Sequence, residues 1–276
     1  MSINLASKYS NKVDERFQLK SLTENIGLNN EYDWAGVKTI SVYSIDNAAM
    51  ENYTRTGTSR YGTPTELGDT KVDYTLSKDR SFATTIDKGN NTEQLMIKSA
   101  GKFLSRQTNE VVVPEIDVYR LATWSAAGIA NSHTDTTAIT ASNAYLKFLE
   151  AQAALDDDKV PVTGRICFVT PAYHNFIKQD STFNRASDMN QKMLINGQVG
   201  EIDGVKIIKA PSSYFPANHA FILMHPKVSV SPKKLEDYKV HQDPPGISGH
   251  LIEGRIIYDC FVLAQKVNGI WVHKVA

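Results

Sequence analysis

Hydrophobic and polar residues alternate in several short segments of this chain, and such period-two alternation is typical of half-buried β-strands. The segments are Val37–Ile45, Val72–Leu76 and Phe82–Ile86. The last two flank the turn residues Ser77–Arg80, which allows them to pair with each other. Alternatively, the later strands return along the polar, threonine-rich segment Tyr53–Tyr61. The alternation predicts the strands and leaves both pairings open.

A period of 3.6 residues predicts three helices in the middle of the chain. The first is expected to start at Asn91, a good N-cap, with Gln94 as its capping-box partner. The second is expected to start at Pro114, which is favoured as a first helical residue, and to stop at Gly128. The third covers Ala144–Leu155.

The second half of the chain mixes short strands with one more helix. Strands are expected at residues 165–169, 204–208 and 221–224, within 251–266, and at 270–273, and a short helix is expected from Pro171. Residues 232–250 contain prolines and glycines and are expected to form a long loop. Because helices and strands do not repeat as βαβ units, the order of elements predicts an α+β fold.

Composition narrows the class of protein without assigning a function. The chain has 276 residues, of which 41% are hydrophobic and 22% are charged, as in globular proteins. Lys and Arg number 30 and Asp and Glu number 30, so the net charge is zero, which argues against a dedicated nucleic-acid-binding protein. Two cysteines, Cys167 and Cys260, exclude a disulfide scaffold and are expected to be small core residues. No signal peptide or membrane span is apparent.

The chain lacks the short motifs that usually reveal catalysis. There is no phosphate loop, no dinucleotide-binding G-x-G-x-x-G, no H-E-x-x-H and no G-x-S-x-G. No catalytic, cofactor-binding or metal-binding residue is therefore predicted, and no cofactor is expected. His133–Asp135 is interpreted as a solvated loop and Asp156–Asp158 as a solvated turn. An enzyme of unknown class remains an alternative that needs a deep pocket lined by His133, Asp135 or His174.

Residues 51–87 are expected to form an extended loop. A two-stranded hairpin is marginally stable alone, so it needs a surface to lie on. Residues 51–80 carry five positive and five negative side chains, a balance that suits a mixed-charge protein surface better than phosphate. The alternative is an ordinary solvated hairpin. The candidate inter-subunit contacts are Arg55, Arg60, Glu66, Asp69, Lys71, Asp73, Lys78, Asp79 and Arg80.

Five segments together resemble a known family. They are Leu76–Phe82 with Ile86-Asp87 and the helix from Asn91; Val113–Arg120; Thr170–Tyr173 with Phe176–Lys178; Gly200–Ile207; and Gly254–Leu263 with Lys266 and Gly269–Val272. In this order they resemble the major capsid proteins of tailed bacteriophages, whose fold is shared with encapsulin shells and the herpesvirus capsid floor. The resemblance covers the chain from about residue 30 to its end.

The resemblance implies a domain organisation for the α+β fold. Residues 1–30 correspond to an N-terminal arm and 51–87 to the extended loop, which in this family lies across an adjacent subunit. The peripheral domain would combine 31–50, 88–122 with the long spine helix, and the closing strands at 249–276. Residues 123–248 would form the axial domain around the local five- or six-fold axis.

The resemblance also implies a function and partners. The chain would assemble with itself, as pentamers and hexamers, into the icosahedral head shell around double-stranded DNA, touching DNA only weakly and without sequence specificity. A portal protein, a separate scaffolding protein or none, and a decoration protein are the further expected partners, with assembly in the bacterial host cytoplasm and no role for a membrane. An encapsulin-type nanocompartment is the alternative. The lysine–asparagine cross-link of some relatives cannot be mapped here, and Lys71, Lys78 and Lys88 are interpreted as surface lysines.

Overall fold

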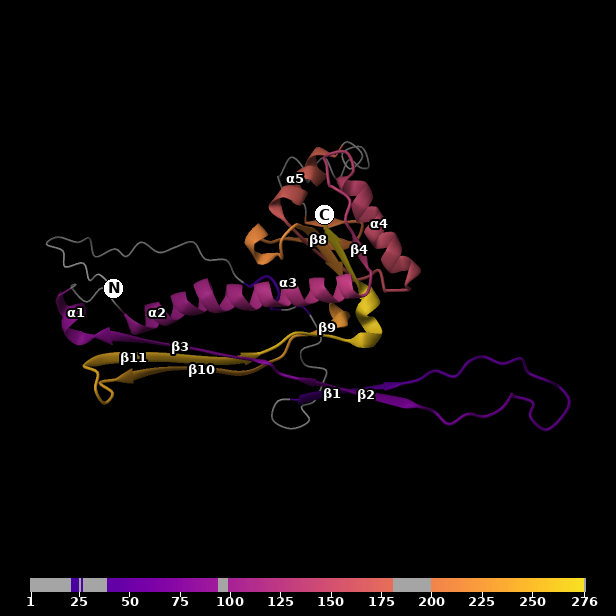
Figure 1. Cartoon of the computed structure of the whole chain (residues 1–276), viewed down its shortest axis with the longest axis horizontal. Helices are drawn as coiled ribbons and strands as arrows, with labels where there is room; N and C mark the ends of the chain where they lie inside the picture. The colour runs from indigo at the N-terminus through magenta and orange to yellow at the C-terminus, as the bar shows by residue number, and fades with distance from the viewer. Residues whose placement is uncertain (1–20, 25, 27–38, 94–98, 181–199, 276) are drawn as a thin grey trace. The chain divides into compact units, whose positions relative to one another are not determined.

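The computed structural model describes residues 21–24, 26, 39–93, 99–180 and 200–275 (Figure 1). The chain divides into two compact units, residues 30–77 and residues 1–29 with 78–276. Among the described residues, no helix combines the length and the apolar character that crossing a membrane requires.

The smaller unit contains one antiparallel hairpin. Strand β1 (Thr39–Ile45) pairs with β2 (Asp69–Thr75), with Thr39 opposite Thr75 and Ile45 opposite Asp69. The predicted strand Val37–Ile45 is confirmed from Thr39 onward, and its first two residues lie outside the described residues. Both predicted pairings of Val72–Leu76 are wrong, because the partner is β1, which comes earlier in the chain than either predicted partner. Alternation identifies a strand but carries no information about its partner.

The first sheet of the larger unit has three antiparallel strands in the order β10-β11-β3. Strand β3 covers Lys78–Asp87, β10 covers Lys233–Gln242 and β11 covers Gly249–Tyr258. The predicted loop at 232–250 is therefore wrong over most of its length. Strand β10 lies at the sheet edge and is largely polar, so it lacks the apolar period that signals a strand.

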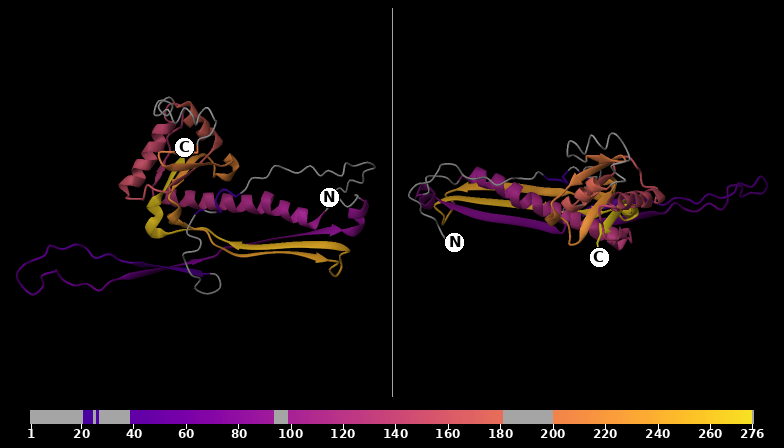
Figure 2. Two further views of the ribbon diagram at one scale, coloured as in Figure 1. Left: turned by 180° about the vertical axis from the view of Figure 1, so that it is seen from behind. Right: turned by 90° about the horizontal axis from the view of Figure 1, so that it is seen from above.

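A long helical stretch runs along this sheet (Figures 1 and 2). It comprises α2 (Ala100–Gln107), a π-helical turn (Thr108–Val112) and α3 (Val113–Ala130), after the short helix α1 (Lys88–Glu93). The π turn ends two residues before Pro114, which has no N–H and whose ring would clash with a carbonyl one turn earlier in a regular helix. Helix α3 thus starts one residue before Pro114, which confirms the predicted start to within one residue, and the π turn joins it to α2.

Two predicted helix ends are wrong for local reasons. Asn91 lies inside α1, and the carboxylate of Asp87 accepts a hydrogen bond from the Asn90 N–H (2.9 Å), so Asp87 is the residue that caps this helix. Gln94 lies outside the described residues. Helix α3 continues through Gly128 to Ala130 because this glycine faces β13, where a Cβ atom would lie 2.7 Å from Val272 Cγ2.

The second sheet of the larger unit has six strands in the order β4-β13-β8-β5-β7-β6. In chain order these are β4 (Thr134–Asp135), β5 (Ile166–Val169), β6 (Glu201–Ile202), β7 (Val205–Lys209), β8 (His219–Met224) and β13 (Ile270–Lys274). The strands predicted near 165–169, 204–208, 221–224 and 270–273 are confirmed. Its helices α4 (Ala144–Asp157) and α5 (Pro171–Gln179) confirm two predicted helices, and Thr170 caps α5.

The six-stranded sheet is buried on both faces. On one face, Phe148 of α4 and Tyr173 of α5 pack against Phe221. On the other, Trp124 of α3 packs against Phe168 and Ile222. Cys167 and Cys260 are buried and unpaired, as predicted. The remaining pieces are the strand pair β9 (Ser229–Val230) with β12 (Phe261–Val262) and the 3-10 turns Ser212–Tyr214, Pro226–Val228 and Ala264–Gly269.

Candidate assembly surfaces

The hairpin of the smaller unit exposes many large apolar side chains. Met50 is 98% exposed and Tyr61 is 88% exposed, so both side chains are almost wholly accessible to solvent. The other exposed large apolar residues of this unit are Tyr43, Ile45, Tyr53, Leu67 and Val72. Several exposed large apolar side chains within one small unit are typical of a site of protein–protein contact.

The connection between β1 and β2 has a defined shape at its tip. The N–H of Thr54 donates to the carbonyl of Arg60 (3.0 Å), and Arg60 Nε donates to the carbonyl of Gly57 (3.1 Å). The rings of Tyr53 and Tyr61 meet edge to face with their centroids 5.0 Å apart. The tip therefore presents an ordered aromatic pair with an arginine beside it.

Six of the nine predicted contact residues lie on this smaller unit. Arg55, Arg60, Glu66 and Asp69 are exposed along it. On β2, Lys71 Nζ lies 3.2 Å from a carboxylate oxygen of Asp73.

Asp73 also links the two strands of the hairpin. Ser41 Oγ donates to the Asp73 carboxylate (2.5 Å), and the hydrogen bonds from Ser41 and Lys71 lower the pKa of Asp73. The charges of the hairpin thus include exposed side chains and one carboxylate, that of Asp73, which links β2 to β1 through Ser41.

The other three predicted residues lie on β3 in the larger unit. Lys78 Nζ sits 5.0 Å from the centroid of the Tyr119 ring. Asp79 receives two hydrogen bonds from Arg255 of β11, from Nε (2.9 Å) and from Nη2 (2.6 Å). Arg80 Nε donates to Glu115 of α3 (2.7 Å).

These contacts connect β3 to the rest of its own chain. The Asp79–Arg255 pair joins neighbouring strands with bidentate geometry, and Arg80 joins the sheet to the long helix. Tyr258 Oη donates to the same Glu115 oxygen (3.1 Å). A contact of Lys78, Asp79 or Arg80 with a second subunit stays a prediction.

One face of the three-stranded sheet carries charges that the sequence analysis missed. In register, Asp237 and Ser81 flank Arg255, and Lys239 and Ala83 flank Glu253. A hollow of about 340 Å³ lies over this face, floored by the small residues Ser81, Ala83 and Gly254 and lined by the charged ones. The turn residues Asp243-Pro244-Pro245-Gly246 were the available signal for a hairpin here.

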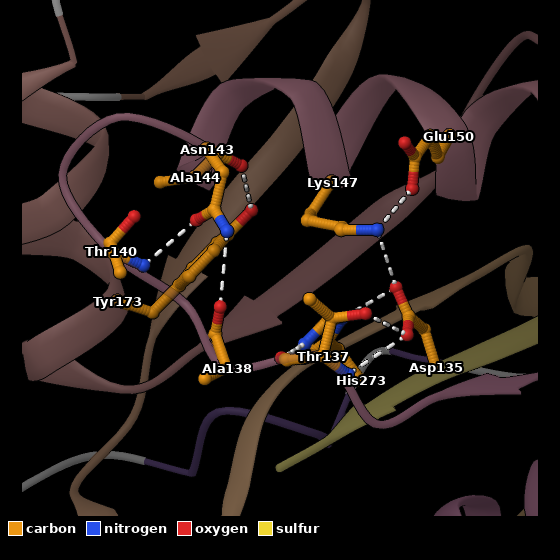
Figure 3. A network of polar contacts seen from close by, with 10 residues as sticks. All are labelled: Asp135, Thr137, Ala138, Thr140, Asn143, Ala144, Lys147, Glu150, Tyr173 and His273. Carbon is orange, nitrogen blue, oxygen red and sulfur yellow. Dashed lines mark hydrogen bonds and ion pairs between the residues drawn. The ribbon is translucent and has the colours of Figure 1, made fainter.

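Asp135 belongs to a polar network, so its interpretation as solvated loop is wrong (Figure 3). Strand β4 pairs with β13, which fixes Thr134 and Asp135 at the sheet edge. The carboxylate of Asp135 accepts from Thr137 N (2.9 Å) and Oγ1 (2.8 Å) and lies 3.1 Å from Lys147 Nζ. Burial opposes ionisation of this carboxyl, but the bonds from Thr137 and Lys147 outweigh it and lower the pKa of Asp135 to about 2.

His273 supports the same network from inside the sheet. Its side chain is fully buried, Nε2 lies 2.8 Å from the carbonyl of Thr137, and the ring stacks on Phe221 with centroids 5.2 Å apart. Burial lowers the pKa of His273. The network attaches the segment before α4 to the sheet, which is a structural role.

Asp156 and Asp157 end α4 and Asp158 lies in the turn that follows; all three are exposed, as predicted, but Asp156 and Asp158 also bond within the chain. Asp156 accepts from Arg165 Nη2 (2.6 Å), and the side chain of Arg165 is 1% exposed. Asp158 lies 3.1 Å from His133 Nε2 and accepts from Asn268 Nδ2 (3.3 Å). Buried Arg165 requires partners in its own chain, which the sequence could not show.

Nothing in the described part of the chain gathers these groups into a reaction site. No set of three or more His, Cys, Asp or Glu side chains there is placed to hold a metal ion. The hollow over the three-stranded sheet is lined by none of His133, Asp135 and His174.

The chain is similar over nearly its whole length to solved phage head structures. The capsid of the cyanophage P-SCSP1u matches with a TM-score of 0.76 and 12% identity, covering 98% of this chain and 93% of that chain. The mature capsid of bacteriophage PhiM1 matches with a TM-score of 0.73 and 11% identity, covering 98% and 92%. The head of Helicobacter pylori bacteriophage KHP40 matches with a TM-score of 0.67 and 11% identity, covering 98% and 95%.

Sequence comparisons give no such match. No protein-family model matches the chain, and a search of curated proteins finds no significant relative. The structural likenesses show that the α+β chain has the fold of these phage capsid structures, as the sequence resemblance implied.

Proposed function

We propose that this chain is the major capsid protein of a tailed bacteriophage and that its copies form the icosahedral head shell around double-stranded DNA. The observation that carries the proposal is the match to capsid structures across 97% or more of the chain. Since the match leaves no large part of the fold unaccounted for, the protein would act as a structural component of the virion and not as an enzyme.

The exposed hairpin supports self-assembly as the route to that shell. An apolar surface of this kind gains stability only when another surface covers it. The balanced charges of the hairpin favour a mixed-charge protein partner, which a second copy of the chain provides. Contacts of this type would join subunits within and between pentamers and hexamers.

The finer organisation is proposed on the same basis. The arm would occupy 1–30, the extended loop 51–87 and the axial domain 123–248. The peripheral domain would combine 31–50, 88–122 and 249–276. A portal protein and a separate scaffolding protein would complete the assembly in the bacterial cytoplasm, with a decoration protein as a further partner. The zero net charge favours weak, non-specific contact with packaged DNA.

Electron microscopy of the purified chain tests the proposal. Closed shells of uniform size are expected, either from the chain alone or with a scaffolding protein encoded beside its gene. Persistent small species under every assembly condition would overturn it. Shells that enclose an enzyme cargo instead of accepting DNA would identify the encapsulin alternative.

A loop-shortened variant tests the role of the hairpin. The N–H of Asp46 donates to the carbonyl of Gly68 (3.0 Å), so residues 47–67 can be replaced by Asn-Gly without opening β1 and β2. The variant is expected to stay folded and to lose shell formation. Shells formed by the shortened variant would exclude the hairpin from assembly. A matched variant keeps the loop length and replaces residues 55–60 with Gly and Ser, which separates the effect of loop length from that of these side chains.

A further inference from the structure

A short N-terminal segment docks on the long helix through two buried charges. Ser21–Glu24 and Ile26, here called the strap, lie against α3, where the strap is drawn in indigo (Figure 1). Thr23 is fully buried, as are Asp117 and Arg120 of α3 to within 1%. Part of the predicted arm at 1–30 therefore packs into the larger unit.

Both carboxylate oxygens of Asp117 accept hydrogen bonds from the strap. Oδ1 accepts from Ser21 Oγ (2.9 Å) and from Thr23 Oγ1 (2.5 Å), and Oδ2 accepts from the N–H of Leu22 (2.9 Å). An ionised carboxylate that accepts hydrogen bonds from neutral donors tolerates burial.

Arg120, the second buried charge, makes fewer hydrogen bonds to the strap than Asp117 does. Its Nη1 donates to Thr23 Oγ1 (3.0 Å), and its Nη2 reaches the carbonyl of Ser231 at 3.4 Å. Its Nε is buried without a hydrogen-bond partner among the described residues. The hydroxyl of Thr23 thus stands between the two charges, donating to Asp117 and accepting from Arg120.

On α3, Asp117 and Arg120 could each serve as the partner of the other if the strap were absent. Asp117 and Arg120 are three residues apart on α3, a spacing that makes side chains neighbours on one helix face. In the docked structure no ion pair joins these two described residues directly. If the strap leaves, the two side chains can meet each other without any change in α3.

The apolar contribution of the strap is small. Of the strap, only Leu22 and Ile26 pack against the core cluster around Trp124, which is otherwise built from α3, the six-stranded sheet and nearby segments such as those of Phe215, Val228 and Cys260. At its exposed side, Glu24 adds one ion pair with Lys233 (3.2 Å). Such a segment ranks among the parts of a fold that open first.

We propose that the strap is releasable: it leaves α3 as a unit, Asp117 and Arg120 then pair directly, and the larger unit stays folded. The strap precedes residues 27–38 and the hairpin of the smaller unit, so docking fixes one end of that connection and release frees it. This consequence for shell assembly rests on the proposed function, whereas release itself does not.

Hydrogen exchange on the unassembled full-length chain tests release. The amides of Leu22 and Ile26 are hydrogen-bonded to Asp117 and to the Thr23 carbonyl, so their exchange reports strap opening. Both are expected to exchange at least 100-fold faster than the amides of β8 at 221–224. Exchange of strap and β8 at one common rate would overturn the proposal.

The variant Thr23→Val tests the docking chemistry, because valine keeps the volume and removes the bridging hydroxyl. Exchange at Leu22 is expected to rise at least tenfold, with β8 changed less than twofold. The control Thr123→Val lies on the same helix, where Thr123 Oγ1 donates to the Tyr119 carbonyl, and should leave Leu22 unchanged. An unchanged strap in Thr23→Val, or equal acceleration of strap and β8, would contradict the proposal.

Discussion

The six-stranded sheet and the β1–β2 hairpin differ in where their apolar side chains lie. In the sheet, β8 buries consecutive residues on both faces, under α4 and α5 on one side and α3 on the other. In the hairpin, Tyr43, Ile45 and Val72 remain exposed. The sheet obtains its stability within one chain, whereas the hairpin carries the surface expected of a segment that another chain covers.

The first prediction concerns the largest effect, which should fall on the sheet. Phe221→Ala removes a fully buried ring that stacks on Tyr173 with centroids 4.6 Å apart. The free energy of unfolding is expected to fall by about 3–5 kcal/mol because a cavity replaces the ring. Denaturant titration measures this change. A loss of less than about 1 kcal/mol would contradict the assignment of the main stabilising contacts to this sheet.

The second prediction concerns the three-stranded sheet, which, among the described residues, has a helix over one of its faces. Gly254 lies beneath the Phe82 and Tyr238 rings, and a Cβ there would fall 2.4 Å from Phe82 Cε1. Gly254→Ala is expected to reduce the free energy of unfolding by about 1–3 kcal/mol through overpacking. A companion variant, Gly254→Ala with Phe82→Leu, should recover part of the loss, and no recovery would exclude the ring contact as its cause.

The third prediction concerns pH and the edge of the six-stranded sheet. The pKa of Asp135 is about 2 in the folded chain against 3.8 for an ordinary carboxyl, so its ionised form stabilises the fold above about pH 4. That contribution, on the order of 1 kcal/mol, is expected to disappear as pH falls from about 4 to 2. The free energy of unfolding of the wild type and of Asp135→Asn, measured across this pH range, gives the contribution of Asp135. Parallel pH profiles of the two proteins would show that Asp135 is not its source.

The fourth prediction returns to the hairpin, where the effect on folding should be smallest. Tyr61→Ala, at a position 88% exposed, should change the free energy of unfolding by less than about 0.5 kcal/mol. Shell yield should nevertheless fall, since the ring is available to a second copy. Calorimetry with electron microscopy separates the two effects. Full shell yield together with reduced stability would reverse the proposed contrast between hairpin and sheet.

Local chemistry predicted the sheet better than the hairpin. The strand around Phe221, the helix from Pro171 and the burial of Cys167 followed from apolar runs and capping residues, because these elements lie between layers that are apolar throughout. Strand β10 was missed since it pairs at an edge and bears charges such as Asp237 and Lys239. Its only signal was the turn that follows it.

For the candidate surfaces, the sequence located the hairpin charges but not their partners. Arg55, Arg60 and Glu66 are exposed on it, whereas Asp79 and Arg80 bond to residues 176 and 35 positions away. Ion pairs between distant residues depend on the register of strands, which alternation does not encode.

The amino-acid sequence by itself determined where most strands and helices form, that the fold is α+β and that no familiar catalytic motif is present, because these properties follow from local propensity and residue identity. Tertiary structure alone decided that β2 pairs with β1, that α3 continues past Gly128 and that Asp117 and Arg120 are buried under the strap. Each of these depends on residues far apart in the chain, and contacts over such separations are set by packing.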